Sequence, residues 1–148
     1  MDYENVIDER TDPEDLNNAR KNYINGPTNN QSIFAYSHAM IGSNQKSDIR
    51  QGIGGFEKLL RECKDPSERR SYVFYLSLGY ARVKSYDTAI RFIDALLKEE
   101  PKNAQAKSLK EAIKSKMTHD GLIGAAIVGG GVAAAVAGAV ALFSLVRK

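Results

Sequence analysis

The chain has 148 residues, of which 43% are hydrophobic and 26% are charged, and its formal net charge is +3. The single cysteine, Cys63, excludes an internal disulfide, and the two histidines, His38 and His119, lie too far apart to suggest metal-ligand spacing. These features predict neither an enzyme nor a bound metal or cofactor, and nothing in them indicates a small-molecule substrate.

Residues 1–12 form an acidic N-terminal arm. Residues 1–15 hold seven acidic residues and one basic residue, and they include Val6 and Ile7 as a short apolar pair. The arm has neither the basic start nor the apolar centre of a secretory signal peptide. Together with the lone cysteine, this favours a reducing, cytosolic location for the domain that follows.

Residues 13–119 predict a cytosolic domain built only of helices. Apolar residues recur there at three- and four-residue spacing, and no alternating stretch indicates a sheet. Start and stop signals divide this part of the chain into six helices, near 13–25, 31–42, 47–62, 66–83, 86–99 and 103–118.

Capping residues support these helix boundaries. Asp12 and Asp65 each precede a proline, which combines an N-cap with the residue favoured at the first helical position. Glu68 is spaced to complete a capping box with Asp65. Ser85 and Asn103 are expected to cap two further helices.

Two helix pairs, near 33–66 and 70–103, predict degenerate tetratricopeptide-like repeats. The second pair fits the spacing of this helix–turn–helix unit, which is ~34 residues long, at Leu76, Tyr80, Tyr86, Ala89, Ile93 and Leu96. The first pair matches more weakly, with Gly52 at the position of Ala89. Ser77 replaces the usual glycine and tryptophan is absent, so spacing alone also leaves an ordinary helical bundle open.

An apolar run at residues 121–146 predicts a single C-terminal transmembrane helix. A bilayer core ~30 Å thick is crossed by ~20 apolar residues in helical form, and this run contains no charge and no proline. Its large apolar side chains include Leu122, Ile127, Val132, Val136 and Leu142, and it is followed by a short basic tail of Arg147 and Lys148. We therefore expect a tail-anchored protein with residues 1–120 in the cytosol. Ridges of small residues in the run would also allow a homo-oligomer to form.

The last cytosolic helix is basic. Its lysines, with one just before it, are Lys102, Lys107, Lys110, Lys114 and Lys116. A basic helix beside a membrane gains roughly 1 kcal/mol per residue near an anionic leaflet, and a solvated helix face accounts for the same lysines equally well. Neither interpretation requires a nucleic-acid partner.

Several stretches in register resemble the mitochondrial fission protein one family. They are SDIRQG at 47–52, SYVFYLSLG at 71–79, KSYDTA at 84–89, EPKNAQA at 100–106 and DGLIG at 120–124. The resemblance runs from about residue 31 through the apolar run, and it is less clear before that. It implies a tail-anchored adaptor on the mitochondrial outer membrane and on the peroxisomal membrane, linked to dynamin-related GTPases directly or through other adaptors.

In tetratricopeptide repeats, the first helix of each pair lines a concave groove that accepts a segment of a partner. By repeat position, the groove should be lined by Phe34, Ser37, Ile41, Phe74, Leu78, Ala81 and Arg82. These positions are mostly apolar and do not form the Lys and Asn clamp that grips a C-terminal carboxylate. We expect an adaptor that recruits or regulates the organelle fission machinery. The alternative is a tail-anchored repeat receptor for protein import, chaperones or organelle quality control.

The charge asymmetry suggests a regulatory arm made of Val6, Ile7, Asp8 and Glu9. In one hypothesis the arm folds over the groove, with its apolar pair against Phe74 or Leu78 and its acids towards Arg82 and nearby bases. Because a tethered arm has a high effective concentration, it would compete with a partner. Residues 1–11 could equally be a disordered, solubilising tail.

Overall fold

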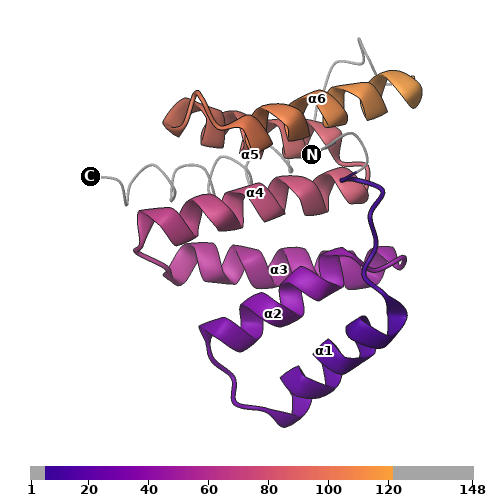
Figure 1. Cartoon of the computed structure of the whole chain (residues 1–148), viewed down its shortest axis with the longest axis vertical. Helices are drawn as coiled ribbons and strands as arrows, with labels where there is room; N and C mark the ends of the chain where they lie inside the picture. Colours follow the sequence, from indigo (N-terminus) through magenta and orange to yellow (C-terminus); the bar gives the residue numbers. More distant parts are fainter. Residues whose placement is uncertain (1–5, 122–148) are drawn as a thin grey trace.

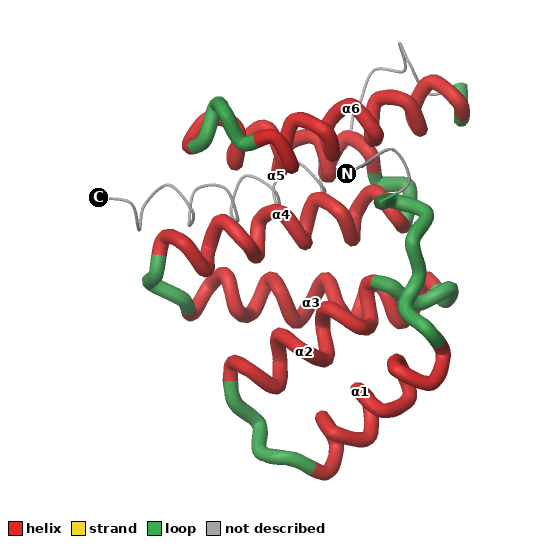
Figure 2. Tube along the Cα trace, viewed as in Figure 1, coloured by secondary structure: helices red, strands yellow, loops and turns green. Residues whose placement is uncertain are grey.

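The computed structural model describes residues 6–121, which form six α-helices joined by short loops (Figures 1 and 2). The helices are α1 (Pro13–Asn25), α2 (Asn30–Ile41), α3 (Lys46–Glu62), α4 (Pro66–Arg82), α5 (Tyr86–Glu99) and α6 (Ala104–His119). Each boundary lies within one residue of the predicted range. The predicted all-α, six-helix domain is therefore confirmed for this part of the chain.

The expected transmembrane helix lies outside the described residues from position 122 onward, and so do the basic residues Arg147 and Lys148. Within residues 6–121, none of the helices is long and apolar enough to cross a bilayer.

Side-chain caps fix most of the helix starts. Asp12 and Asp65 each accept a hydrogen bond from a backbone N–H two residues later, at 2.8 Å, and Asn103 caps α6. Two expectations were wrong in detail: Asp65 forms no capping box with Glu68, and Ser85 makes no side-chain cap. The capping box lies instead at α2, where Asn29 and the third helical residue bond reciprocally.

Successive helices pack against one another from α1 to α6, so the domain is a stack of helix pairs (Figure 1). Its core is continuous from the first pair, α2 and α3, to α6. Burying each large aliphatic side chain contributes ~1.5–3 kcal/mol relative to leaving it exposed. The most buried large side chains include Phe56, Leu59, Leu76, Phe92, Ile93, Leu96 and Leu109.

A buried arginine joins the two helix pairs. Arg69 of α4 is 2% exposed, and its Nη1 donates to the carbonyl oxygens of Leu60 and Cys63 at the end of α3. Those carbonyls would otherwise be left without partners where the helix ends. Gly79 of α4 lies against Ile53 of α3, and the two pairs therefore approach closely.

The end of α6 is tied back to the start of α5. The Tyr86 hydroxyl donates to Asp120 Oδ2 at 2.6 Å, and Lys84 Nζ lies 4.0 Å from the same oxygen. Burial and this hydrogen bond raise the pKa of Tyr86 above its ordinary value. Gly121 follows in the left-handed region at φ 71°, where a residue without a side chain is favoured.

Candidate partner-binding groove

A cavity of about 580 Å³ opens where α2, α4 and the start of α6 face the arm. Helices α2 and α4 are the first helices of the two repeats, so the cavity lies on the face where a repeat groove is expected. Its lining comes from the arm (Val6, Glu9, Arg10, Thr11), from α2 and its end (His38, Ile41, Gly42), from α4 (Ser67, Arg70, Ser71, Phe74, Tyr75, Leu78, Arg82) and from α5, α6 and their connection (Leu96, Glu100, Asn103, Gln105).

The structure brings part of the predicted groove set to this cavity. The predicted residues that line it are Ile41, Phe74, Leu78 and Arg82. Phe34 instead borders a neighbouring hollow together with Ser71 and Tyr72. Ser37 and Ala81 line neither hollow, and they are 0% and 1% exposed.

The small predicted residues lie in helix contacts for a steric reason. Ser37 Oγ points at α3, and a Cβ added to Gly55 would lie only 1.8 Å from it. Ala81 belongs to the buried core cluster. Small side chains at these positions allow helices to pack closely, whereas larger ones on the same helices reach the cavity. Repeat position alone does not separate the two roles.

Two aromatic groups in the cavity were missed from the sequence. The rings of His38 and Tyr75 meet edge to face, with centroids 5.0 Å apart, and Phe34 lies 5.8 Å from Tyr75. Burial, and then the positive charge of Arg82, lower the pKa of His38 below its ordinary value. The signal was available: residues 34, 38 and 41 share one helix face at four- and three-residue spacing.

The far end of the cavity is polar. Arg70 Nε lies 2.7 Å from Glu100 Oε1, and the other oxygen of that carboxylate accepts from Asn103 Nδ2 at 2.8 Å. The groove therefore runs from an ion pair between α4 and the α5–α6 loop to the apolar surface and guanidinium near Arg82. No local pattern predicts this pair, because the fold brings its members together.

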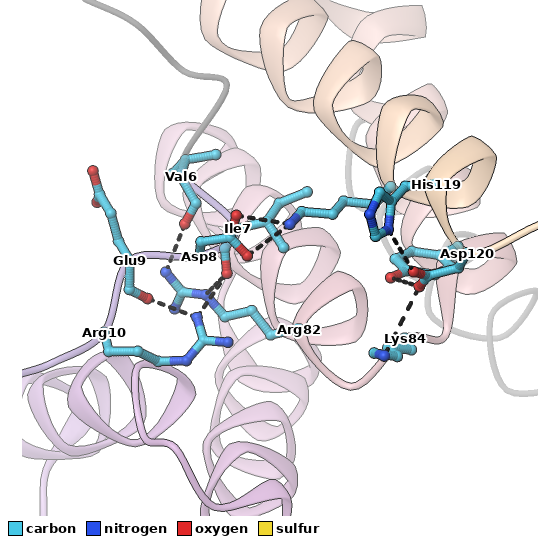
Figure 3. A network of polar contacts seen from close by, with 11 residues as sticks. Val6, Ile7, Asp8, Glu9, Arg10, Arg82, Lys84, His119 and Asp120 are labelled. Atoms are coloured by element: carbon cyan, nitrogen blue, oxygen red, sulfur yellow. Dashed lines mark hydrogen bonds and ion pairs between the residues drawn. The ribbon is translucent and has the colours of Figure 1, made fainter.

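The arm lies across the Arg82 end of the cavity (Figure 3). Arg82 Nη2 donates to the carbonyl oxygen of Val6 at 3.0 Å, and its Nε donates to that of Ile7 at 3.4 Å. Its Nη1 donates to the carbonyl oxygen of Ile41 at 2.8 Å, so one guanidinium links the arm to α2. Burial, and then the nearby charge of Arg10, lower the pKa of Arg82 to about 10.

The acidic side chains of the arm lie near bases of the helical domain, but the direct ion pair of Asp8 is not with Arg82. Asp8 pairs with Lys116 of α6, whose Nζ lies 2.8 and 2.7 Å from its two carboxylate oxygens. Thr11 ties the base of the arm to the end of α2 through its N–H to Gly42 O at 2.9 Å and its hydroxyl to Ala39 O at 3.0 Å.

Two family models match the chain. The Fis1 N-terminal tetratricopeptide repeat matches residues 31–62, and the Fis1 C-terminal tetratricopeptide repeat matches residues 70–122. The FIS1-related protein fis-2 of Caenorhabditis elegans is 55% identical over 152 residues, covering 100% of both chains. The mitochondrial fission 1 protein of Homo sapiens is 39% identical over 146 residues, covering 96% of this chain and 95% of the relative. The chain belongs to the Fis1 family.

Solved Fis1 structures share the fold. Yeast Fis1 in complex with an Mdv1 fragment is 27% identical with a TM-score of 0.69, over 77% of this chain and 91% of that chain. The solution structure of yeast Fis1 is 28% identical with a TM-score of 0.67, over 86% and 89%. The predicted family resemblance and the tetratricopeptide-like repeats are confirmed. The Fis1 family models begin at residue 31, so the arm and α1 precede both of them.

Proposed function

We propose that the chain is an adaptor of the mitochondrial fission machinery whose groove binds a segment of a dynamin-related GTPase or of one of its adaptors. The cavity carries this proposal, because it combines the apolar side chains of Ile41, Phe74 and Leu78 with charged groups, among them the guanidinium of Arg82. The lining is more polar than the apolar groove expected from repeat position. A concave surface that combines apolar side chains with fixed charged groups suits a peptide segment that carries both kinds of side chain. The structure of yeast Fis1 with an Mdv1 fragment supports a fission adaptor as the partner class.

The name of the rat and human relatives, mitochondrial fission 1 protein, supports association with mitochondria. We assign the domain to the cytosolic face of the outer membrane and of the peroxisomal membrane, held there by the apolar run at 121–146. The length of the run and its lack of charge support a single-pass anchor. Helix α6 ends directly before it, at His119.

The position of the arm supports a regulatory role for it. Val6 and Glu9 line the same cavity as Phe74 and Leu78, so a partner that fills the whole groove must displace them. Deleting residues 1–11 should therefore tighten binding of such a partner. Added salt should weaken the hold of the arm, because the Asp8–Lys116 pair is partly exposed.

Proximity labelling in cells tests the proposed function. The intact chain is compared with Phe74→Glu in the groove, with Ile24→Glu as a matched surface control, and with a chain ending at residue 120. Ile24 is 76% exposed on α1, away from the cavity, so its replacement should change nothing. We expect dynamin-related GTPases or their adaptors among the labelled proteins. Their labelling should be lost with Phe74→Glu while the domain still melts cooperatively. Equal labelling by the groove and control variants would overturn the proposal.

A further inference from the structure

The arm shows which chemistry one end of the groove accepts. Residues 6–8 form a turn rather than a helix, yet the side chain at its centre, Ile7, is only 3% exposed. Burial this deep is typical of a core residue and not of a chain end. The site beneath the turn is therefore shaped to hold a branched apolar side chain.

Arg82 sets a second requirement. Its guanidinium has one acceptor inside the helical domain, the carbonyl oxygen of Ile41, and two on the arm, the carbonyl oxygens of Val6 and Ile7. A partly buried cation that loses its hydrogen-bond acceptors is disfavoured. A segment that replaces the arm must therefore bring oxygen acceptors to the same place.

This requirement restricts the backbone of an incoming segment. Carbonyl groups inside an α-helix are already bonded within the helix, and only its last turn leaves them free. Turns and extended segments also present free carbonyls. The middle of an apolar helix therefore cannot satisfy Arg82, whereas a turn such as residues 6–8 can.

Lys116 supplies a third requirement, for charge. Its Nζ contacts both carboxylate oxygens of Asp8, the residue that directly follows the buried isoleucine. The side chain of Lys116 is 31% exposed. Its partner Asp8 belongs to the same turn, residues 6–8, whose carbonyl oxygens accept from Arg82, so both cations lie at this end of the groove. With two cations facing this end, a basic segment is repelled and an acidic one is attracted.

We propose, on the basis of the proposed function, that the partner segment presents a branched apolar residue directly followed by Asp or Glu, within a turn. The apolar side chain takes the place of Ile7, the turn carbonyls accept from Arg82, and the carboxylate pairs with Lys116. The Ile7-Asp8 dipeptide of the arm imitates this motif and holds the site until the partner arrives.

A peptide selection tests the motif whichever protein carries it. The full chain, kept in detergent and carrying Ile7→Asn with Asp8→Asn to weaken the arm, is presented to a library of random short peptides. We expect enrichment of Ile or Val followed by Asp or Glu. A synthetic peptide with the sequence of residues 4–11, ENVIDERT, should compete with the enriched peptides.

Charge reversal then separates recognition from folding. Lys116→Glu in the same chain should shift the enriched residue after the apolar one from acidic to basic, and should weaken binding of ENVIDERT about threefold to tenfold. Lys114→Glu is the matched control, because this lysine is on the same helix and pairs only weakly, at 3.8 Å, with its neighbour Glu111. It should leave the selection unchanged.

Three results would overturn the inference. They are enrichment of apolar helix-forming peptides without an acid, identical selections with Lys116→Glu and Lys114→Glu, and exchange of arms between two copies of the wild-type chain, seen as a doubled mass in light scattering. Any of these could occur while groove-dependent labelling of fission proteins persists in cells. The proposed function would then stand and only the motif would fail.

Discussion

The two repeats have the same helix–turn–helix shape but close their helix contacts differently. In the first repeat, a Cβ added to Gly52 of α3 would lie 2.7 Å from Ser37 O and 2.9 Å from Ile41 N of α2. In the second, the matching position is Ala89, which is 0% exposed, and the Ser77 hydroxyl of α4 donates to its carbonyl oxygen at 2.8 Å. The contact between α2 and α3 leaves no room for a methyl group at Gly52, whereas the contact between α4 and α5 accommodates the methyl group of Ala89.

The difference teaches why the repeat signature is degenerate. The residue type that a repeat requires at its close contact depends on how near the two backbones lie, and this distance differs between the pairs. Each repeat therefore matches a single consensus sequence only weakly, because the two use different small residues, Gly52 and Ala89, to achieve the same close packing. The predictions below test this difference, in order of expected effect.

The largest effect should be equal in the two repeats. Leu59 and Leu96 occupy matching positions, and each is 1% exposed. Replacing either by Ala leaves a cavity and should lower the free energy of unfolding by ~2–5 kcal/mol. Thermal melting of a chain ending at residue 120 measures both. A large effect in only one repeat would show that the two do not share a register.

The next effect should distinguish the repeats. Gly52→Ala forces backbone atoms apart and should destabilise by ~1–3 kcal/mol through overpacking. Ala89→Gly removes one methyl group and adds backbone freedom, which costs about 1 kcal/mol in a helix. Urea unfolding measures the free energy of unfolding of both variants, provided that its dependence on urea concentration has the same slope as in the wild type. The comparison between the repeats fails if Gly52→Ala is neutral.

A stabilising substitution serves as the internal control for the glycine argument. Gly54 is exposed on α3, and a Cβ there would meet nothing within 4 Å. Gly54→Ala should therefore raise the free energy of unfolding by about 1 kcal/mol through helix propensity alone. The same urea titration gives the value, and a loss of stability would mean that α3 tolerates no side chain on this face either.

The smallest effect concerns pH. His38 lies in the first repeat where the second has Tyr75, and burial lowers its pKa from the ordinary value of 6.5. Below pH 6.5 the unfolded chain therefore binds a proton that the folded chain does not, and stability falls as the pH drops. His38→Gln should flatten this part of the stability profile. An unchanged slope between pH 5 and 7 would show that His38 is not responsible.

The fold could be predicted from the sequence because residues close to each helix end determine where that helix begins and stops. An aspartate followed by a proline starts both α1 and α4. The three- and four-residue spacing of apolar residues in α3 and α5 indicates a helix and not a strand. The capping box was misplaced because at α2 a serine, Ser32, takes the role usually given to Glu or Gln. The capping-box motif does not include serine at this position, although the serine hydroxyl makes the same hydrogen bond to the N-cap backbone.

The candidate site was less predictable because it depends on the path of the whole stack. Figure 1 shows the segment before α1 running back along the stack towards α6. This path brings Asp8 to Lys116 across 108 residues of sequence, a pairing that no local pattern encodes. Repeat position did place Phe74 and Leu78 at the cavity, because they are large residues on the side of α4 that lines it. It did not place Ser37 correctly, because the size of this residue directs it into a helix contact.

The bond between Tyr86 and Asp120 also has a mechanical consequence. A pull on the chain at residue 121 enters the domain through the last turn of α6, and this hydrogen bond passes part of the load to the first residue of α5. The pull would have to break the bond before it could peel α6 from the stack. Under a load applied at residue 121, this hydrogen bond would keep strain out of the groove.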